Sequence, residues 1–188
     1  MNINEAIQSR RSVRDFTSQK VDEASIHLLL EAAVHAPTAR HEEPWVFAVI
    51  QNKNLLNRLS DDIKELLASG GDPIHPHGAG HGAEHFTTPE FNIFYNAATL
   101  IIIYAKPMGE FVVADCWLAA ENLMLLACAS GLGSCVIGLA VSALNTPKWK
   151  TELGIAAEMT AIAPIIVGVP AAETPAVARK PPEVQTWM

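Results

Sequence analysis

Apolar positions along this chain follow a helical period in some segments and form short β-branched runs in others. Helical spacing begins after Asp22 and stops before Pro37, and it returns over 53–68. β-branched and aromatic runs predict strands at 45–52, 134–138 and 161–170, and ordered apolar structure at 94–105. Because the 45–52 run has no polar face, we expect that strand to be buried on both sides.

Three further segments complete the predicted elements. Residues 2–11 indicate a helix in which Asn2 and Glu5 have the spacing of a capping box, and Pro147 can open another short helix. The segment 110–130 is apolar nearly all round, which is typical of a helix at the centre of a core or an interface, and Gly131 and Gly133 are expected to end it. This alternation, without internal repeats, predicts an α+β or α/β sandwich with a central helix, in which residues 1–188 form one domain.

Two segments lack periodicity. Residues 69–89 are rich in Gly, Pro and His, so we expect a loop there. Residues 170–188 form an extended C-terminal tail rich in Pro and Ala. Because this tail contains Trp187 but is too polar to form a core, we expect it to pack along another surface.

Composition adds an expectation about assembly and location. The chain is 49% hydrophobic and 18% charged, which is more apolar than a typical soluble protein, and an obligate dimer would bury the surplus. The first residues lack the apolar region of an export signal, and the longest apolar runs fall short of the roughly 20 residues that span a bilayer. We therefore expect a cytoplasmic protein with no membrane association.

Cys116, Cys128 and Cys135 are odd in number and widely spaced, which favours reduced and mostly buried thiols.

A cluster of cations stands out from the formal net charge of −7: Arg10, Arg11 and Arg14 lie within five residues. On a helix Arg10 and Arg14 would share a solvated face, whereas guanidinium groups also match phosphate oxygens in pairs. Arg179 and Lys180 form a second basic pair that could converge on the same phosphate. The acidic chain has no longer basic stripe, so we expect no nucleic-acid partner.

Four motifs together resemble the FMN-dependent nitroreductase family in order and spacing. They are RRSVRDF (10–16), APTARHEEPWVF (36–47), DCWLAAENLMLLACASGLGSCVIG (115–138) and IIVGVPAAETPAVARKPPEV (165–184). The resemblance implies an α+β fold with a central sheet flanked by helices, and an intertwined homodimer with one FMN per subunit at the interface. It also implies electron transfer from NADH or NADPH to a small-molecule acceptor such as a nitroaromatic or a quinone.

The resemblance also assigns residues to the cofactor site. Arg10, Arg11, Ser12 and Arg14 would hold the FMN phosphate and ribityl chain, with Arg179 and Lys180 reinforcing the phosphate contacts. The loop of a partner subunit that carries Pro37, Thr38, Ala39 and His41 would lie near the flavin, and the backbone of Gly138, Leu139 and Ala140 would lie against its ring. The cofactor carries the chemistry, so no catalytic side chain is assigned.

Several positions keep a second interpretation. His41 and Glu43 stand where the family usually has Asn and Gln, and the Glu43 carboxylate is expected to disfavour a negatively charged reduced flavin. Gly138 can equally serve a strand-end turn. We expect Asn122 to make a structural hydrogen bond between helices, and Trp45 and Trp117 to be core or interface aromatics.

One feature is not explained by the resemblance. His75, His77, His81 and His85 lie in the 69–89 loop and have a spacing that could wrap zinc or nickel. The alternative, which we favour, is a loop over the mouth of the active site with no metal cofactor. The sequence therefore leaves two other functions open: a protein that binds or fragments flavin without turnover, and a metal-binding module.

Overall fold

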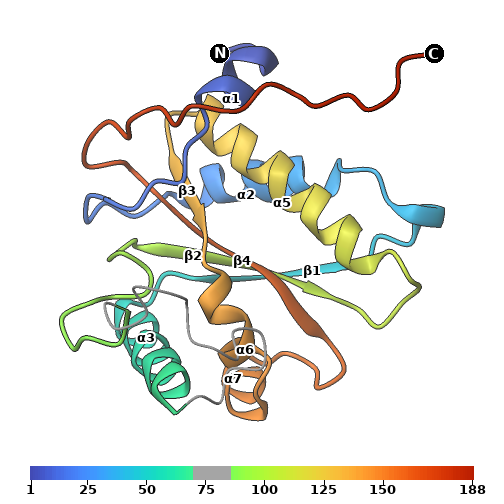
Figure 1. Cartoon of the computed structure of the whole chain (residues 1–188). Coiled ribbons are helices and arrows are strands. Elements are labelled where there is room, and N and C mark those ends of the chain that lie inside the picture. Colours follow the sequence, from blue (N-terminus) through green and yellow to red (C-terminus); the bar gives the residue numbers. More distant parts are fainter. Residues whose placement is uncertain (70–85) are drawn as a thin grey trace.

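The computed structural model describes residues 1–69 and 86–188, which form a four-stranded antiparallel sheet with helices on both faces (Figure 1). The strands are β1 (Trp45–Ile50), β2 (Thr99–Ala105), β3 (Gly133–Val136) and β4 (Thr160–Gly168), in the spatial order β1-β2-β4-β3. All three pairings are antiparallel. The α+β class expected from the sequence is confirmed.

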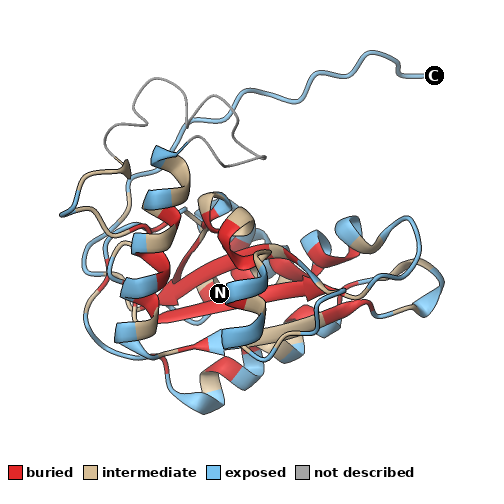
Figure 2. Ribbon diagram, turned by 90° about the horizontal axis from the view of Figure 1, so that it is seen from below, coloured by how far each residue is buried: buried red, intermediate tan, exposed pale blue. Residues whose placement is uncertain are grey.

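The sheet separates two hydrophobic cores. One face is covered by α2 (Glu23–Val34) and α5 (Val112–Ala129), with α1 (Ile3–Ser9) packed on α5. The other face is covered by α3 (Lys53–Ala68), α6 (Val141–Leu144) and α7 (Pro147–Glu152). Strand β2 lies between the layers: Ile101 and Ile103 join the α5 core, while Leu100 and Ile102 join the α3 core. Figure 2 shows the buried residues gathered in the sheet and the inward helix faces.

Helix starts follow the capping residues that the sequence predicts. Asn2 and Glu5 make both hydrogen bonds of the capping box, and the Asp22 side chain accepts from the N–H of Ser25. Pro147 occupies the first turn of α7, as expected from its fixed φ. These local predictions are confirmed because capping depends on neighbours within one turn.

Three local predictions are wrong: where the first helix ends, how far β1 is buried, and what Gly133 does. α1 ends at Ser9, not near Arg11, so Arg10 and Arg14 do not share a helical face. β1 is an edge strand, and Val49 keeps 39% of its surface exposed although we expected burial on both sides. Gly133 does not terminate α5 but begins β3.

The central helix α5 packs one side against the sheet, and its apolar residues extend beyond that side. Within the described residues it is long and apolar enough to cross a membrane, but buried helices of soluble proteins pass the same test. The side of α5 that packs against the sheet carries Cys116, Ala119 and Leu123. Asn122 Nδ2 donates to the carbonyl of Ala32 at 3.2 Å, which confirms the expected hydrogen bond between α5 and α2.

The tail leaves the body of the chain after β4. Figures 1 and 2 show it running outward from the body, and Val177, Val184 and Trp187 are exposed. Its expected packing along another surface is therefore not made within this chain and stays a prediction. His75, His77, His81 and His85 lie outside the described residues.

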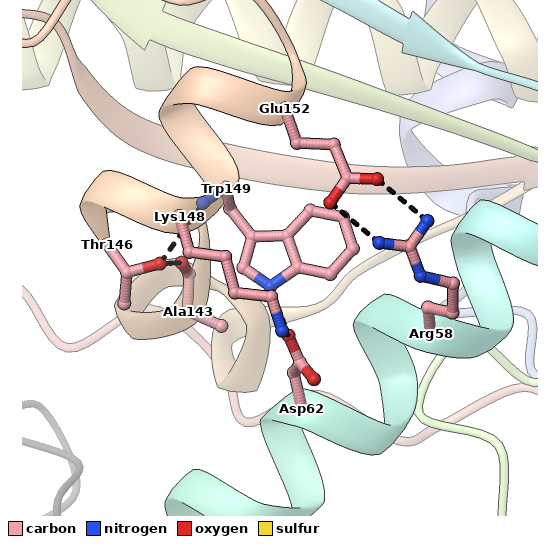
Figure 3. Close-up of polar contacts among 7 residues, drawn as sticks. All are labelled: Arg58, Asp62, Ala143, Thr146, Lys148, Trp149 and Glu152. Atoms are coloured by element: carbon pink, nitrogen blue, oxygen red, sulfur yellow. Dashed lines mark hydrogen bonds and ion pairs between the residues drawn. The ribbon is translucent and has the colours of Figure 1, made fainter.

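A polar cluster joins α7 to α3 across the second core (Figure 3). The buried Trp149 indole donates its Nε1–H to Asp62 Oδ2 at 2.8 Å, and Lys148 also pairs with Asp62. Arg58 makes two parallel contacts to Glu152, at 2.8 and 2.9 Å. The indole contact is the important one, because a buried donor without a partner costs more than an exposed ion pair contributes.

We expect Asp62→Ala to lower the free energy of unfolding by about 1–3 kcal/mol, because Trp149 Nε1 would lose its acceptor. Urea unfolding followed by tryptophan fluorescence measures this change. Asp61→Ala is the matched control, because the Asp61 carboxylate is exposed and its partner Lys64 also donates to the Pro89 carbonyl. Its effect should stay within about 1 kcal/mol. Equal stabilities of the two variants would show that the indole contact has no special weight.

Candidate functional site

Two cavities adjoin strand β3, and five of the predicted cofactor residues line one or the other. The first has a volume of about 310 Å³ and lies where α1 ends, α5 ends and the tail begins; Arg10 and Arg11 line it with Cys128 and Ser134. The second has a volume of about 160 Å³, and Arg14 lines it with Gly138 and Leu139. The two linings follow one another along β3, because Gly133 and Ser134 border the first cavity and Cys135 and Val136 border the second.

The arginine segment reaches β3 because it pairs with the sheet after α1 ends. Ser12 forms a parallel bridge with Ser134, and the N–H of Val13 donates to the Ser134 carbonyl at 3.0 Å. Gly133 permits this approach, since a Cβ at that position would lie 2.8 Å from the Val13 Cβ. The segment therefore presents its side chains along β3.

The two guanidinium groups of the first cavity have unequal surroundings. Arg10 Nε lies 3.4 Å from Glu121 Oε1 on α5. Arg11 Nη1 donates to the carbonyls of Gln8 and Arg10 at 2.6 and 2.9 Å, whereas Arg11 Nε is buried and has no partner among the described residues. A buried guanidinium N–H without an acceptor is suited to an anionic ligand such as a phosphate.

The second cavity has an aromatic wall that the sequence analysis missed. Phe91 and Tyr95 line it together with Cys135, and the Arg14 guanidinium carbon lies 5.8 Å from the Tyr95 ring centroid. The i, i+4 spacing of the two aromatic residues was the available signal. It was overlooked because the segment lies between the irregular loop and the apolar stretch of β2.

Of the three predicted residues in the turn after β3, two line the second cavity and the third is buried in the core. Gly138–Ala140 form a 3₁₀ turn in which Gly138 and Leu139 line the second cavity. Ala140 is buried in the core, and its N–H donates to the Ile137 carbonyl at 3.0 Å. The space beside Gly138 is open, so packing alone does not require a glycine there.

The cysteines are free thiols, as expected. Burial raises the pKa of Cys135, against the opposing influence of the Arg14 charge and a Ser12 hydrogen bond. Burial, together with the Asp115 charge, raises the pKa of Cys116 to about 11. Both thiols are therefore neutral near pH 7 and are not suited to nucleophilic chemistry, while Cys128 is half-buried at the first cavity.

The loop that carries Pro37, Thr38, Ala39 and His41 lies away from both cavities. Its Ala39 N–H donates to both carboxylate oxygens of Asp115 at 3.3 Å, and Asp115 is buried in the first turn of α5. The first cavity lies at the other end of α5, where Cys128 lines it, and Arg10 reaches back to Glu121 at the middle of this helix of about 27 Å. A single chain therefore does not bring this loop to the other predicted residues (Figure 1).

This loop is also strained. Arg40, His41 and Glu43 have φ values of 55°, 57° and 46°, in the left-handed region that side chains rarely adopt. The buried Asp115 carboxylate holds the turn in place. Strained backbone that is held by its surroundings is frequent at functional sites.

Two further observations concern predicted binding groups, and neither tests the histidine loop, which lies outside the described residues. Arg179 and Lys180 are exposed in the tail and line neither cavity, although residues 170–176 of the same tail contribute to the first. Among the residues the structure describes, no group of three or more His, Cys, Asp or Glu side chains could hold a metal ion.

The two cavities fit an elongated cofactor with an anionic end and a planar ring. The first supplies guanidinium groups, including the unpartnered Arg11 Nε. The second supplies aromatic side chains, an open glycine and the Arg14 charge. These residues are suited to FMN.

Comparison with known proteins points in the same direction. A sequence profile of the Nitroreductase family matches residues 7–169. A protein of Methanothermobacter thermautotrophicus, provisionally named NADH dehydrogenase/NAD(P)H nitroreductase, is 30% identical over 143 residues, which cover 74% of this chain and 62% of that relative. The chain thus spans less than two thirds of that protein.

Solved structures extend the comparison to the fold. A nitroreductase with bound FMN from Bacteroides fragilis has a TM-score of 0.81 and 26% identity, covering 100% of this chain and 98% of that one. An iodotyrosine deiodinase bound to FMN and 3-iodo-L-tyrosine has a TM-score of 0.75 at 19% identity, with complete coverage of both chains, and shows the shared fold alone.

Proposed function

Because this chain belongs to the nitroreductase family, we propose that it is an oxidoreductase that uses FMN to pass electrons from NADH or NADPH to an electron-poor small molecule. The observation that carries the proposal is the placement of Arg10, Arg11 and Arg14 along β3, between a cationic cavity and an aromatic one. FMN, when bound, supplies the hydride and electron chemistry. The chain supplies binding, orientation and charge.

The first cavity would hold the phosphate. Arg11 Nε is already buried and lacks an acceptor, so a phosphate oxygen would satisfy it without new desolvation of that group. Arg10 is held near the cavity by Glu121 through Nε, which leaves its terminal amino groups to form paired hydrogen bonds. Ser12 would contact the ribityl chain beside β3, and the tail would bring Arg179 and Lys180 to the phosphate.

The second cavity would hold the ring. Gly138 and Leu139 line it, whereas the Ala140 N–H is already bound to Ile137, so we assign ring contacts to the first two positions in preference to the third. Arg14 would place positive charge beside the ring, which favours the negative charge that reduction adds. No acid or base side chain is required in this assignment.

We further propose a homodimer formed through α5. This helix and the residue before it expose Phe111, Val113, Trp117 and Leu118, the last two with exposed fractions of 42% and 46%. A two-fold axis that packs α5 antiparallel on its copy would bring the 37–43 loop of one subunit to the arginine end of the other. The strained His41 turn would then border the flavin of the partner, with a small acceptor bound between them.

The acceptor class is a separate part of the proposal. Iodotyrosine deiodinase of Drosophila melanogaster is 29% identical over 107 residues, or 56% of this chain and 37% of that protein. A halogenated phenol therefore joins nitroaromatics and quinones as a candidate acceptor. The cytoplasmic location remains part of the proposal as well.

We expect the FMN-loaded protein to lose its flavin absorption bands on anaerobic addition of NADH or NADPH, and to regain them on addition of an acceptor. Three acceptors separate the alternatives: a nitroaromatic, a quinone and 3-iodo-L-tyrosine. Bound flavin that neither donor bleaches would indicate a binding or flavin-fragmenting protein. Failure to bind FMN at all would contradict the proposed function.

Variants locate the bound cofactor in this experiment. Arg10→Ala should weaken FMN binding by roughly tenfold or more, because a charge-assisted hydrogen bond is lost. Lys20→Ala is the matched control, since Lys20 is exposed and lines neither cavity.

Bound FMN should also slow alkylation of Cys128 in the first cavity, while the buried Cys116 and Cys135 stay unmodified in both states.

We expect Trp117→Glu to convert a dimer to a monomer of 20.3 kDa in gel filtration with light scattering, because it places a charge in the apolar face of α5. The same variant should bind FMN more weakly, since the proposed site needs the loop of a second subunit. Thr151→Glu adds the same charge at an exposed position of α7, on the other face of the sheet, and should leave the dimer intact. A wild-type monomer at micromolar concentration would contradict the proposed assembly.

We expect Glu43→Gln to raise the midpoint potential of bound FMN by about 20 mV, equivalent to roughly 1 kcal/mol for two electrons. The physical reason is that the Glu43 carboxylate, in the strained loop, would repel the charge added on reduction. Spectroelectrochemical titration measures the shift, with Glu23→Gln on α2 as the control. An unchanged potential would show that this carboxylate does not face the ring.

A further inference from the structure

The turn that precedes β2 holds an aromatic residue in a strained conformation at the edge of the second cavity. Tyr95 has φ 51° and Asn96 has φ 57°, both in the left-handed region. For a bulky side chain this conformation is a genuine outlier. Tyr95 lines the cavity directly.

Neighbouring groups impose this conformation on Tyr95. The Tyr95 N–H donates to the Asn92 carbonyl at 2.9 Å, and the Asn92 side-chain oxygen accepts from Phe94 N–H at 2.9 Å and from Asn96 N–H at 3.4 Å. Below the turn, the buried Ile93 N–H donates to Ser60 Oγ of α3 at 3.0 Å. The Phe91 ring meets the Tyr95 ring edge-on at 5.4 Å between centroids. The strain persists because these contacts fix both ends of the turn.

The Tyr95 ring is the contact that locates the Arg14 charge. The Arg14 guanidinium carbon lies 5.8 Å from the ring centroid, within the range of a cation–π interaction. Within the described ranges, no carboxylate lies at ion-pair distance from Arg14. An exposed arginine side chain is otherwise free to take many rotamers, so the ring selects those that keep the charge at the cavity.

We propose that Tyr95 is a positioning residue that acts through Arg14: its ring holds the guanidinium at the mouth of the second cavity, where charge accumulates when the bound cofactor is reduced. This inference rests on the proposed function, because it takes the second cavity as the site of the flavin ring. It explains why a strained aromatic residue stands in this turn. Tyr95 itself is not assigned a catalytic role.

The test compares Tyr95→Phe with Tyr95→Leu. Tyr95→Phe keeps the ring and should bind FMN with wild-type affinity and midpoint potential. Tyr95→Leu removes the ring, and we expect roughly threefold weaker FMN binding to the apoprotein and a shift of the midpoint potential to more negative values. Fluorescence titration and spectroelectrochemistry give the two quantities without reference to turnover.

Two controls separate positioning from packing. Asn96→Gly relaxes the neighbouring strained position without touching the ring, so it should change neither quantity. In an Arg14→Gln background, Tyr95→Leu should have no additional effect on affinity or potential, because the two residues act as one unit.

The outcomes distinguish this inference from the proposed function. If wild-type protein binds FMN but Tyr95→Leu changes neither affinity nor potential, the positioning role is wrong and the proposed function stands. An equal effect of Tyr95→Leu with and without Arg14 would also overturn the inference, because Tyr95 would then act by itself. If wild-type protein binds no FMN, both are overturned.

Discussion

The pairing of residues 12–17 with the end of the sheet is the constraint on which the candidate site depends. The Val13 N–H bonds to Ser134, and the Thr17 N–H bonds to the Val169 carbonyl at 2.9 Å, so the segment is fixed at both ends. Gly133 and Gly168 permit this approach, since added Cβ atoms would lie 2.8 Å from Val13 and Phe16. Arg14 is thereby positioned within the segment, whereas Arg10 and Arg11 lie between it and the end of α1, where the Arg10 N–H donates to the Ala6 carbonyl.

The second constraint is the length of α5. Its first turn holds the 37–43 loop through Asp115, and its last turn adjoins the cavity that contains Arg10. A rigid helix keeps these two groups apart within one chain, although the sequence motifs place them in one site. The exposed apolar residues of α5 lie at its N-terminal end, beside the 37–43 loop. A partner subunit that covers them would therefore meet this loop as well.

Local patterns predicted more of this protein than long-range ones did. The caps at Asn2 and Asp22 and the helix start at Pro147 depend on contacts within one helical turn. Asn122 was correctly assigned because a half-buried amide on an apolar helix needs a hydrogen-bond partner. The early end of α1 was not predictable, because Arg10 and its neighbours leave the helix to pair with a strand more than a hundred residues away. The aromatic wall was missed for a similar reason: Tyr95 and Arg14 are distant in sequence, and only the fold brings them together.

The Arg11 guanidinium contributes both to the end of helix α1 and to the first cavity. Its Nη1 closes the C-terminal end of α1 by binding the Gln8 and Arg10 carbonyls, while its Nε faces the interior without a partner. An anion that draws this guanidinium toward itself loosens the end of the helix, whereas one that binds Nε alone leaves the helix closed and makes the arginine harder to displace. By linkage, the order of the first nine residues and the affinity for the anion are coupled, and disturbance of a seven-residue helix at the N-terminus changes the occupancy of the cavity.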